Sequence, residues 1–234
     1  MFSELRFHVT SAFQDNPLSS GVYTLPDAAR LLGVPLSRLR SWVRGTARGD
    51  SRHLPVGPFA SRSEKRDRHV DFFTLIELYT VAHLRDAGLS MRTLRHCREE
   101  LATRFSTPYP FALKGLLTDG RRLLKELGED ALLELGTGGQ SAMQSVLEPF
   151  CQRIDFDAAS QLAARFFPLG RDVPVVVSPT HAFGRPVIAG TNLATETIAS
   201  LIRGGESIDD IAREYEIPRE SIKEAWRFEQ RQAA

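Results

Sequence analysis

The chain has 234 residues, of which 42% are hydrophobic and 25% charged, the composition of an ordinary globular protein. Its length predicts two or three domains, and no apolar run approaches the roughly 20 residues that a membrane-spanning helix needs. The first ten residues lack the apolar core of a signal peptide, and Cys97 and Cys151 follow no metal-ligand spacing. We therefore expect a cytoplasmic protein with reduced cysteines and no bound metal or cofactor.

The net charge of +1 conceals an uneven distribution along the chain. Residues 1–70 contain 11 lysines and arginines against 6 aspartates and glutamates, a balance of +5. The remaining residues contain 19 against 23, a balance of −4. A basic front half and an acidic back half indicate that the two parts bind different partners.

Residues 23–44 carry the pattern of a helix-turn-helix. Thr24 can cap the first helix, and Pro26 is tolerated in its opening turn, where backbone N–H groups have no helical partner. Gly33 accepts the left-handed backbone of a turn, and Pro35 restarts a helix. Apolar residues at helical spacing predict the buried faces, namely Ala28, Ala29, Leu32, Leu39, Trp42 and Val43.

The second helix of this pair would present cationic and hydroxyl side chains outward, namely Ser37, Arg38, Arg40, Ser41 and Arg44. Arginine binds guanine edges or phosphate and serine reaches either, so this face predicts a recognition helix for double-stranded DNA. The alternative is a helical hairpin whose arginine face is merely solvated. The agreement between turn, buried face and arginine placement favours DNA binding.

Residues 45–70 are rich in glycine, proline, serine and arginine, which predicts a loop or a small β-wing rather than a helix. Its cations are Arg48, Arg52, Arg62, Lys65, Arg66 and Arg68. A cationic wing beside a recognition helix would contact phosphates without reading sequence. The alternative is a solvated loop, and the position next to the helix pair favours phosphate contact.

Two further helices are predicted after this segment. The helix over 71–87 has a buried stripe and ends at Gly88, and Ser90 can cap the next helix, over 91–105. The stripes comprise Phe72, Leu75, Ile76, Tyr79 and Ala82 in the first helix, and Leu94, Cys97, Leu101 and Phe105 in the second.

Residues 23–105 resemble the winged helix-turn-helix of MerR-type regulators. In that family a second helix pair follows the wing, with a turn much like Gly88-Leu89-Ser90. MerR regulators usually continue into a long dimerising coiled coil, whereas Pro108 and Pro110 interrupt this chain.

Residues 107–172 predict a small β-rich module between two helical parts. Residues 113–127 read as two extended runs around an Asp119-Gly120 hairpin turn. Residues 151–157 and 163–169 alternate in polarity and predict two further strands.

Residues 173–234 begin with an extended apolar run and continue into three predicted helices. The first contains Ile198 and ends at Gly204-Gly205, Ser207 caps the second, and Pro218 opens the third. The inward residues are predicted to be Ile211, Ala212 and Tyr215 in the second helix, and Ile222, Ala225 and Trp226 in the third.

The last two helices repeat the first helix-turn-helix at one fixed offset. Residues 27–30 match residues 210–213, and Val34-Pro35 matches Ile217-Pro218. The outward residues change sign, because Glu220 and Glu224 replace the two serines, and Glu216 replaces the turn glycine. Carboxylates oppose phosphate, so this second unit is predicted to serve dimerisation or protein docking.

The C-terminal part resembles the small homeodomain-like domain of bacterial antitoxins. That family shows a Gly-Arg-Pro-x-Ile-x-Gly-Thr-Arg pattern followed by Gly-x-Ser-x-x-x-Ile. The matching residues are Gly184, Arg185, Pro186, Ile188, Gly190, Thr191, Gly205, Ser207 and Ile211, and Asn192 replaces the usual arginine. The combination is similar to two-domain VapB-type antitoxins, which are encoded beside a PIN-like ribonuclease toxin.

These resemblances imply a mainly α fold with a smaller β-rich middle module (α+β), divided into residues 1–106, 107–172 and 173–234. They imply a non-enzymatic antitoxin that neutralises a PIN-like ribonuclease and, as a homodimer, represses its own operon on a palindromic site. The candidate DNA contacts are the outward face, Arg48, Arg52, Lys65 and Arg66, and the candidate partner contacts are Arg185, Thr191, Asn192, Arg219 and Lys223.

The two alternatives are a stand-alone MerR-like regulator and an enzyme. A stand-alone MerR-like regulator would need a ligand pocket or a thiol–histidine metal set in its back half. An enzyme would need a catalytic motif, and no Ser-His-Asp, zinc or paired-carboxylate signature is visible in the sequence.

Overall fold

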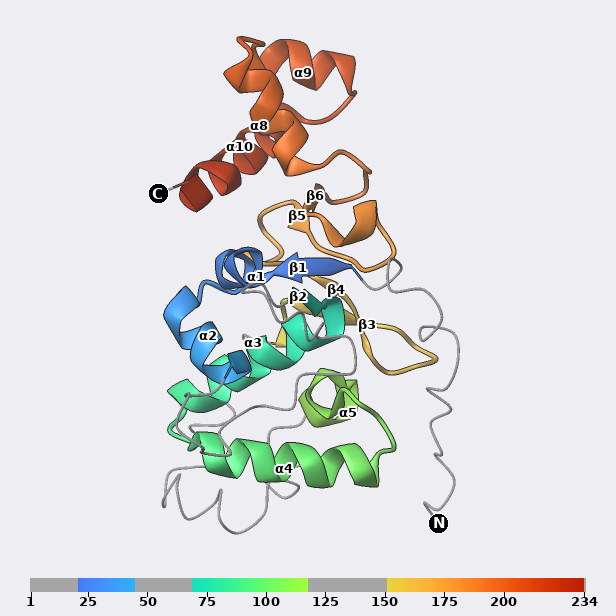
Figure 1. Cartoon of the computed structure of the whole chain (residues 1–234). Helices are drawn as coiled ribbons and strands as arrows, with labels where there is room; N and C mark the ends of the chain where they lie inside the picture. Colours follow the sequence, from blue (N-terminus) through green and yellow to red (C-terminus); the bar gives the residue numbers. More distant parts are fainter. Residues whose placement is uncertain (1–20, 45–68, 118–150, 234) are drawn as a thin grey trace.

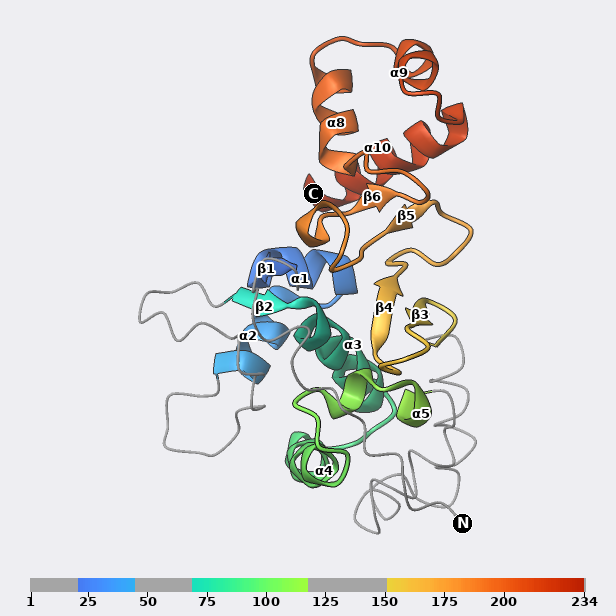
Figure 2. The same ribbon diagram turned by 90° about the vertical axis from the view of Figure 1, so that its right-hand side faces the viewer.

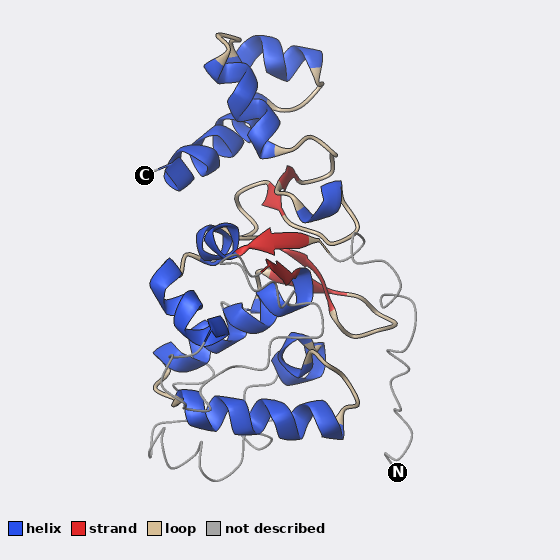
Figure 3. Cartoon of the chain, viewed as in Figure 1, coloured by secondary structure: helices blue, strands red, loops and turns tan. Residues whose placement is uncertain are grey.

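The computed structural model describes residues 21–44, 69–117 and 151–233. An N-terminal module (residues 21–44 and 69–117) and a C-terminal module (residues 173–233) lie at opposite ends of an elongated molecule (Figure 1). Helices dominate both modules, and the short strands gather at the junction between them (Figure 3). The described fold is therefore mainly helical with small antiparallel strand pairs, as the sequence predicted.

The N-terminal module begins with β1 (Val22–Thr24), α1 (Leu25–Leu32) and α2 (Leu36–Arg44). Thr24 and Asp27 form a reciprocal capping box, in which the Thr24 hydroxyl accepts the Asp27 amide N–H at 3.2 Å. Gly33 ends α1 in the left-handed conformation, with φ of 64°. The predicted cap, turn and buried face of the helix-turn-helix are all confirmed.

The next helices are α3 (Phe72–Asp86) and α4 (Met91–Arg104), and β2 (His69–Asp71) pairs antiparallel with β1. Ser90 caps α4 as predicted. The single buried stripe predicted for α3 is wrong, because every residue from Phe72 to Ala82 is buried. Helices and strands surround α3, so it is the central helix of the main core rather than an amphipathic surface helix.

A buried polar network joins α3, α4 and the segment after them. The Arg98 guanidinium donates to Glu77 at 2.6 and 3.1 Å and to the Pro108 carbonyl at 2.7 Å. Burial raises the pKa of the Glu77 carboxyl, and the adjacent Arg98 charge opposes that rise. The Tyr109 hydroxyl donates to Asp71 at 2.5 Å, and Asp71 caps α3. These bonds hold the two helices in one fixed arrangement.

The segment after α4 is helical where an extended run was predicted. It forms the 3-10 turn η2 (Pro110–Ala112) and the short helix α5 (Lys114–Leu117). Pro110 opens η2, and the backbone of Phe111 donates to buried Glu77 at 3.2 Å, which fixes a turn there. The Asp119-Gly120 hairpin lies outside the described residues. The prediction of two extended runs over 113–127 is therefore wrong for 114–117.

The two strands predicted over 151–169 are confirmed as β3 (Ile154–Phe156) and β4 (Ala163–Phe166), which pair antiparallel. They pack into the main core, where the ring centroids of Phe166 and Tyr79 lie 4.8 Å apart. The middle strands thus complete the N-terminal module's core instead of forming a core of their own.

The C-terminal module contains β5 (Val175–Val176), the turn η4 (Ala182–Gly184), β6 (Val187–Ile188), α8 (Thr195–Arg203), α9 (Ile208–Glu214) and α10 (Arg219–Ala233). Its helices form a separate lobe in both views (Figures 1 and 2). Ile198, Ile211 and Ile222 centre its small core. Phe228 of α10 packs instead into the main core, so α10 connects the two modules.

The sequence repeat is also a structural repeat. The Ser207 hydroxyl accepts the Asp210 amide N–H at 3.1 Å, the same cap that Thr24 and Asp27 make. Glu216 takes the left-handed conformation of Gly33, with φ of 54°. One inward prediction is wrong, because Tyr215 is exposed at the end of α9. We call these two helix-turn-helix units the first cassette (residues 24–44) and the second cassette (residues 207–233). Both share caps and turn geometry despite their different turn residues.

Candidate nucleic-acid interface

The outward face of α2 is exposed as predicted. Leu39, Trp42 and Val43 anchor the helix in the main core, and this leaves Ser37 and Arg40 in solvent. Arg40 forms no hydrogen bond or ion pair within the described part of the chain. A guanidinium in this state can bind a base edge or a phosphate without first breaking an internal contact.

Arg38 is held by the protein itself. Its guanidinium lies 2.7 Å from the Asp86 carboxylate and stacks over the Trp42 ring at 5.1 Å. The Ser41 hydroxyl, in turn, donates to the Arg38 carbonyl at 2.7 Å. The polar groups of Arg38 and Ser41 thus make contacts within the protein that hold α2 in place, whereas those of Ser37 and Arg40 are available to bind a partner. Sequence reasoning missed Asp86, which lies 48 positions from Arg38 with no local pattern linking the two.

The remaining predicted DNA contacts cannot be located in the same way. The backbone of Arg44 ends α2, but its side chain lies outside what the structure describes. Arg48, Arg52, Lys65 and Arg66 lie in residues 45–68, which are also outside it. This segment leaves the end of α2 and returns at β2, so both its attachment points belong to the N-terminal module.

The corresponding face of the second cassette is neutralised. Lys223 lies 2.5 Å from Glu220, Arg219 lies 2.9 Å from Asp209, and Arg227 pairs with Glu224. Each of these cations therefore has a carboxylate partner on the same surface. A phosphate bound to these three cations would have to displace or approach those carboxylates, which opposes its binding there.

The other predicted partner contacts are divided between internal and exposed roles. The Thr191 hydroxyl donates to the Ile188 carbonyl at 2.9 Å and accepts the Leu193 N–H at 3.1 Å, so it braces its own turn. Asn192 is exposed beside it. Arg185 is also exposed, and its guanidinium lies 4.0 Å from Glu196. Within the described residues, no hydrogen bond or ion pair joins these residues to Arg219 or Lys223.

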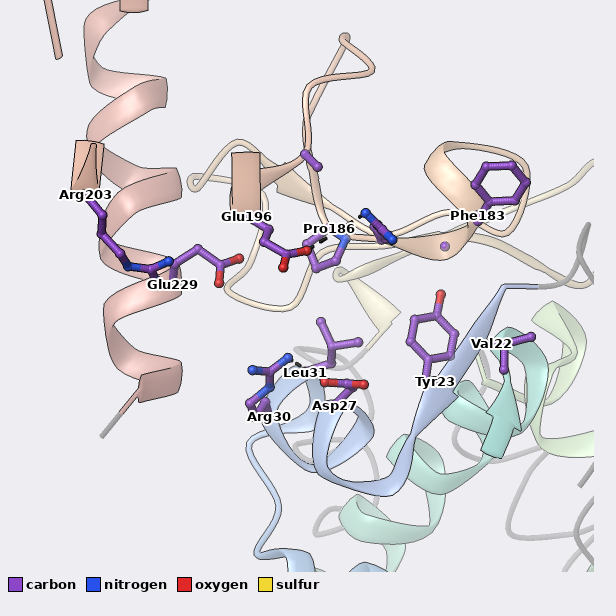
Figure 4. Close-up of a pocket in the computed structure, with 13 residues that line it drawn as sticks. Val22, Tyr23, Asp27, Arg30, Leu31, Phe183, Pro186, Glu196, Arg203 and Glu229 are labelled. Carbon is purple, nitrogen blue, oxygen red and sulfur yellow. Dashed lines mark hydrogen bonds and ion pairs between the residues drawn. The ribbon is translucent and has the colours of Figure 1, made fainter. Parts of the chain in front are cut away.

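A cavity of about 450 Å³ lies between the two modules, and no sequence pattern predicted it. One wall is β1 and α1, which contribute Tyr23, Asp27 and Arg30, and the other is the C-terminal module (Figure 4). Burial, with the nearby Asp71 carboxylate, raises the pKa of the Tyr23 hydroxyl, which therefore stays protonated. The cavity is therefore lined both by the first helix of the helix-turn-helix and by the loop at 184–186, which begins the Gly-Arg-Pro pattern of the C-terminal part.

The described residues contain no cluster of three or more histidine, cysteine or acidic side chains able to hold a metal ion. Within them, no helix combines the length and apolar character needed to cross a bilayer.

Two family descriptions match separate parts of the chain. Residues 21–97 match the family described as "Putative DNA-binding HTH domain", and residues 175–228 match "Protein of unknown function (DUF433)". The first match runs from β1 into the first half of α4, and the second covers β5 to most of α10. The helix-turn-helix prediction for the front of the chain is confirmed by this match.

Two proteins of Mycobacterium tuberculosis are similar over most of their length. "Putative antitoxin VapB45" is 27% identical over 242 residues, covering 95% of each chain. "Uncharacterized protein Rv2308" is 26% identical over 221 residues, covering 89% of this chain and 90% of that one. The crystal structure of Rv2018 from the same organism shares the fold, with a TM-score of 0.67 and 24% identity over 90% of this chain and 98% of that chain.

Proposed function

We propose that this chain is a DNA-binding antitoxin with no catalytic activity of its own. One observation carries the proposal: the chain contains two equivalent helix-turn-helix units, and they differ in how their outward cations are paired with carboxylates. The α2 face exposes Arg40, which has no partner in the described structure, whereas Arg219, Lys223 and Arg227 of α10 are each paired with a carboxylate. This division of labour suits one DNA-binding unit and one protein-binding unit. The similarity to a protein named "Putative antitoxin VapB45" supports the same reading.

In the DNA-binding half, a MerR-like arrangement would place α2 in the major groove. Arg40 and Ser37 would contact base edges, and Arg38 would hold the helix at its working angle through Asp86. Arg44, together with the wing cations Arg48, Arg52, Lys65 and Arg66, would contact phosphates. A homodimer would then bind a palindromic operator in the promoter of its own operon and repress it.

In the protein-binding half, the homeodomain-like C-terminal module would hold a PIN-like ribonuclease toxin. The active site of such a toxin is a cluster of metal-binding carboxylates, so a cation that can reach it would compete with the metal. Arg185 suits this role best, because it is exposed and only loosely paired with Glu196 at 4.0 Å. Asn192 would contribute from the exposed turn, whereas Thr191, Arg219 and Lys223 would act mainly by shaping the surface.

A second candidate function is a stand-alone MerR-like regulator that senses a small ligand. The observation in its favour is the cavity of about 450 Å³ between α1 and the C-terminal module, a size that suits small-molecule sites. Ligand binding there would act directly on the first helix of the DNA-binding unit. The two functions differ in one respect that can be measured, namely whether a protein partner stays bound.

The DNA-binding half is tested with the double-stranded promoter region of the chain's own operon, by fluorescence anisotropy. Arg40→Ala should weaken binding by ~1–3 kcal/mol if the side chain contacts a base. The matched control is Lys223→Ala, at the position equivalent to Arg40 in the second cassette, and it should leave affinity unchanged. Equal losses in both variants, or none in Arg40→Ala, would contradict the assignment of α2 as the recognition helix.

A further inference from the structure

Two exposed apolar side chains line the cavity between the modules, one on each side of it. Val22 and Phe183 are exposed by 50% and 71%, and both line the cavity (Figure 4). Tyr215, exposed by 38%, is the remaining large apolar side chain in solvent among the described residues, and it lies on α9, outside the cavity. Single exposed apolar residues are ordinary, but two at one cavity, one of them aromatic, are typical of a docking site.

The loop that carries Phe183 is held in an unfavourable backbone conformation. Ala182, Phe183 and Gly184 have consecutive φ values of 47°, 56° and 83°. Close packing imposes this path, because a Cβ on Gly184 would lie 2.5 Å from the Tyr23 hydroxyl and 2.8 Å from Cα of Gly21. Non-glycine residues in left-handed conformations cluster at ligand clamps and other functional sites. Here the strain directs an aromatic ring into solvent.

The Tyr23 hydroxyl lies beneath this loop without a partner. Tyr23 is only 4% exposed, and its hydroxyl makes no hydrogen bond within the described structure. Its ring points from β1 toward the 183–186 loop and the cavity (Figure 4). Buried polar groups are nearly always hydrogen-bonded, so an unpaired hydroxyl covered only by this loop marks a point where a shift of the loop would let a bound molecule supply the missing partner.

The charges around the cavity are balanced, which limits the class of molecule that fits. Its lining includes Arg30, Arg185 and Arg203, and also Asp27, Glu196 and Glu229. Arg30 pairs with Asp27 at 2.5 Å, and the Thr195 hydroxyl donates to Glu229 at 2.5 Å. Nucleic acids and free phosphates need an excess of cations, which this site lacks. Mixed polar groups around an exposed aromatic anchor match a protein–protein contact.

We propose that the cavity, with Phe183 and Val22 beside it, is the docking site for a polypeptide segment of the partner toxin. The segment carries no large net charge, places an apolar side chain against Phe183 and Val22, and supplies a hydrogen-bond acceptor to the Tyr23 hydroxyl. This inference rests on the proposed antitoxin function and adds where the partner binds. The toxin would then contact α1, which is the first helix of the DNA-binding unit.

The test uses the full-length chain and the product of the gene adjacent to its own, with affinity measured by biolayer interferometry. Phe183→Ser should weaken binding by at least about tenfold, the effect of losing an interface anchor. The control Tyr215→Ser removes another exposed aromatic ring, which lies away from the cavity, and should change affinity by less than about twofold. Affinity for promoter DNA without toxin should stay the same in both variants.

Tyr23→Phe provides a second, independent test of the docking site. It removes a hydroxyl that is unsatisfied in the free chain, so the melting temperature should hold or rise, while toxin affinity falls several-fold. A structural role for the hydroxyl would instead lower the melting temperature and leave affinity unchanged.

The failures of the two proposals are distinguishable. If the wild-type chain does not bind the adjacent gene product at all, the antitoxin function and the docking site both fall. If the wild type binds and neither Phe183→Ser nor Tyr23→Phe weakens binding, the docking site is wrong while the antitoxin function stands. Should Phe183→Ser lower the melting temperature, Val22→Ser and Tyr23→Phe decide in its place.

Discussion

The guanidinium of Arg38 lies 2.7 Å from the carboxylate of Asp86, the last residue of α3. A carboxylate at the C-terminal end of a helix opposes the helix dipole, and the Arg38 charge compensates for it. The same guanidinium stacks on Trp42, which is buried in the core. Through this pair the outer helix of the DNA-binding unit is tied to the central helix of the fold.

The first prediction is that Arg38 and Asp86 are energetically coupled. Arg38→Ala and Asp86→Ala should each lower the free energy of unfolding, with a coupling of about 0.2–1 kcal/mol, because the pair is partly exposed to solvent. A double-mutant cycle by urea denaturation measures it. Additive losses would mean that the pair contributes nothing, and Arg38 would again become a candidate for direct base contact.

The second prediction concerns the buried Glu77–Arg98 pair, whose side chains are about 5% exposed. Arg98→Met should lower the free energy of unfolding by about 3–5 kcal/mol, because it leaves a buried carboxylate without its charge partner. Arg92→Met, an exposed position on the same helix, is the control and should have little effect. Adding Glu77→Leu to Arg98→Met should recover part of the loss, and a further loss would contradict this interpretation.

The third prediction uses the two equivalent turns. Gly33 and Glu216 both adopt positive φ, at 64° and 54°. Gly33→Glu should destabilise the protein by about 1 kcal/mol, since a side chain strains that conformation, although space for its Cβ is open. Glu216→Gly should leave thermal stability unchanged or raise it. Thermal melts of both variants test the pair, and a loss in Glu216→Gly would show that the glutamate side chain has a stabilising contact.

The fourth prediction concerns thiol reactivity. Burial raises the pKa of Cys151 to about 12, and Cys97 is 1% exposed. The thiolate is the reactive form, so a raised pKa keeps Cys151 protonated and unreactive at pH 8. Neither cysteine should react with a chromogenic disulfide reagent until denaturant is added. Rapid reaction of one thiol in the native protein would contradict either the burial of Cys97 or the raised pKa of Cys151.

The parts of the fold that were predicted correctly are those specified by local chemistry. Thr24, Gly33 and Ser207 act within a few residues of their positions in the sequence, so caps and turns could be read directly. The short extended run at 114–117 was misread because a distant buried acid, Glu77, fixes the turn before it. Tyr215 was misassigned because helical spacing predicted an inward face, while α9 ends one residue before it.

The same distinction between local and distant contacts applies to the candidate sites. Serine and arginine spacing was sufficient to predict the outward face of α2, where Ser37 and Arg40 are exposed. The restraint of Arg38 by Asp86, and the cavity shared by Tyr23 and Phe183, depend on residues brought together from distant parts of the chain. No period or motif in the sequence encodes such contacts, so only the three-dimensional arrangement reveals them.

Co-purification tests the antitoxin function most directly. The tagged full-length chain is expressed from its native gene cassette, and the adjacent gene product is sought in the same peak after size exclusion. We expect a stable complex without ribonuclease activity, from which the adjacent product, once separated, cleaves RNA. A clean oligomer of this chain alone, with the adjacent product expressed but unbound, would contradict the antitoxin function and favour a ligand-sensing regulator.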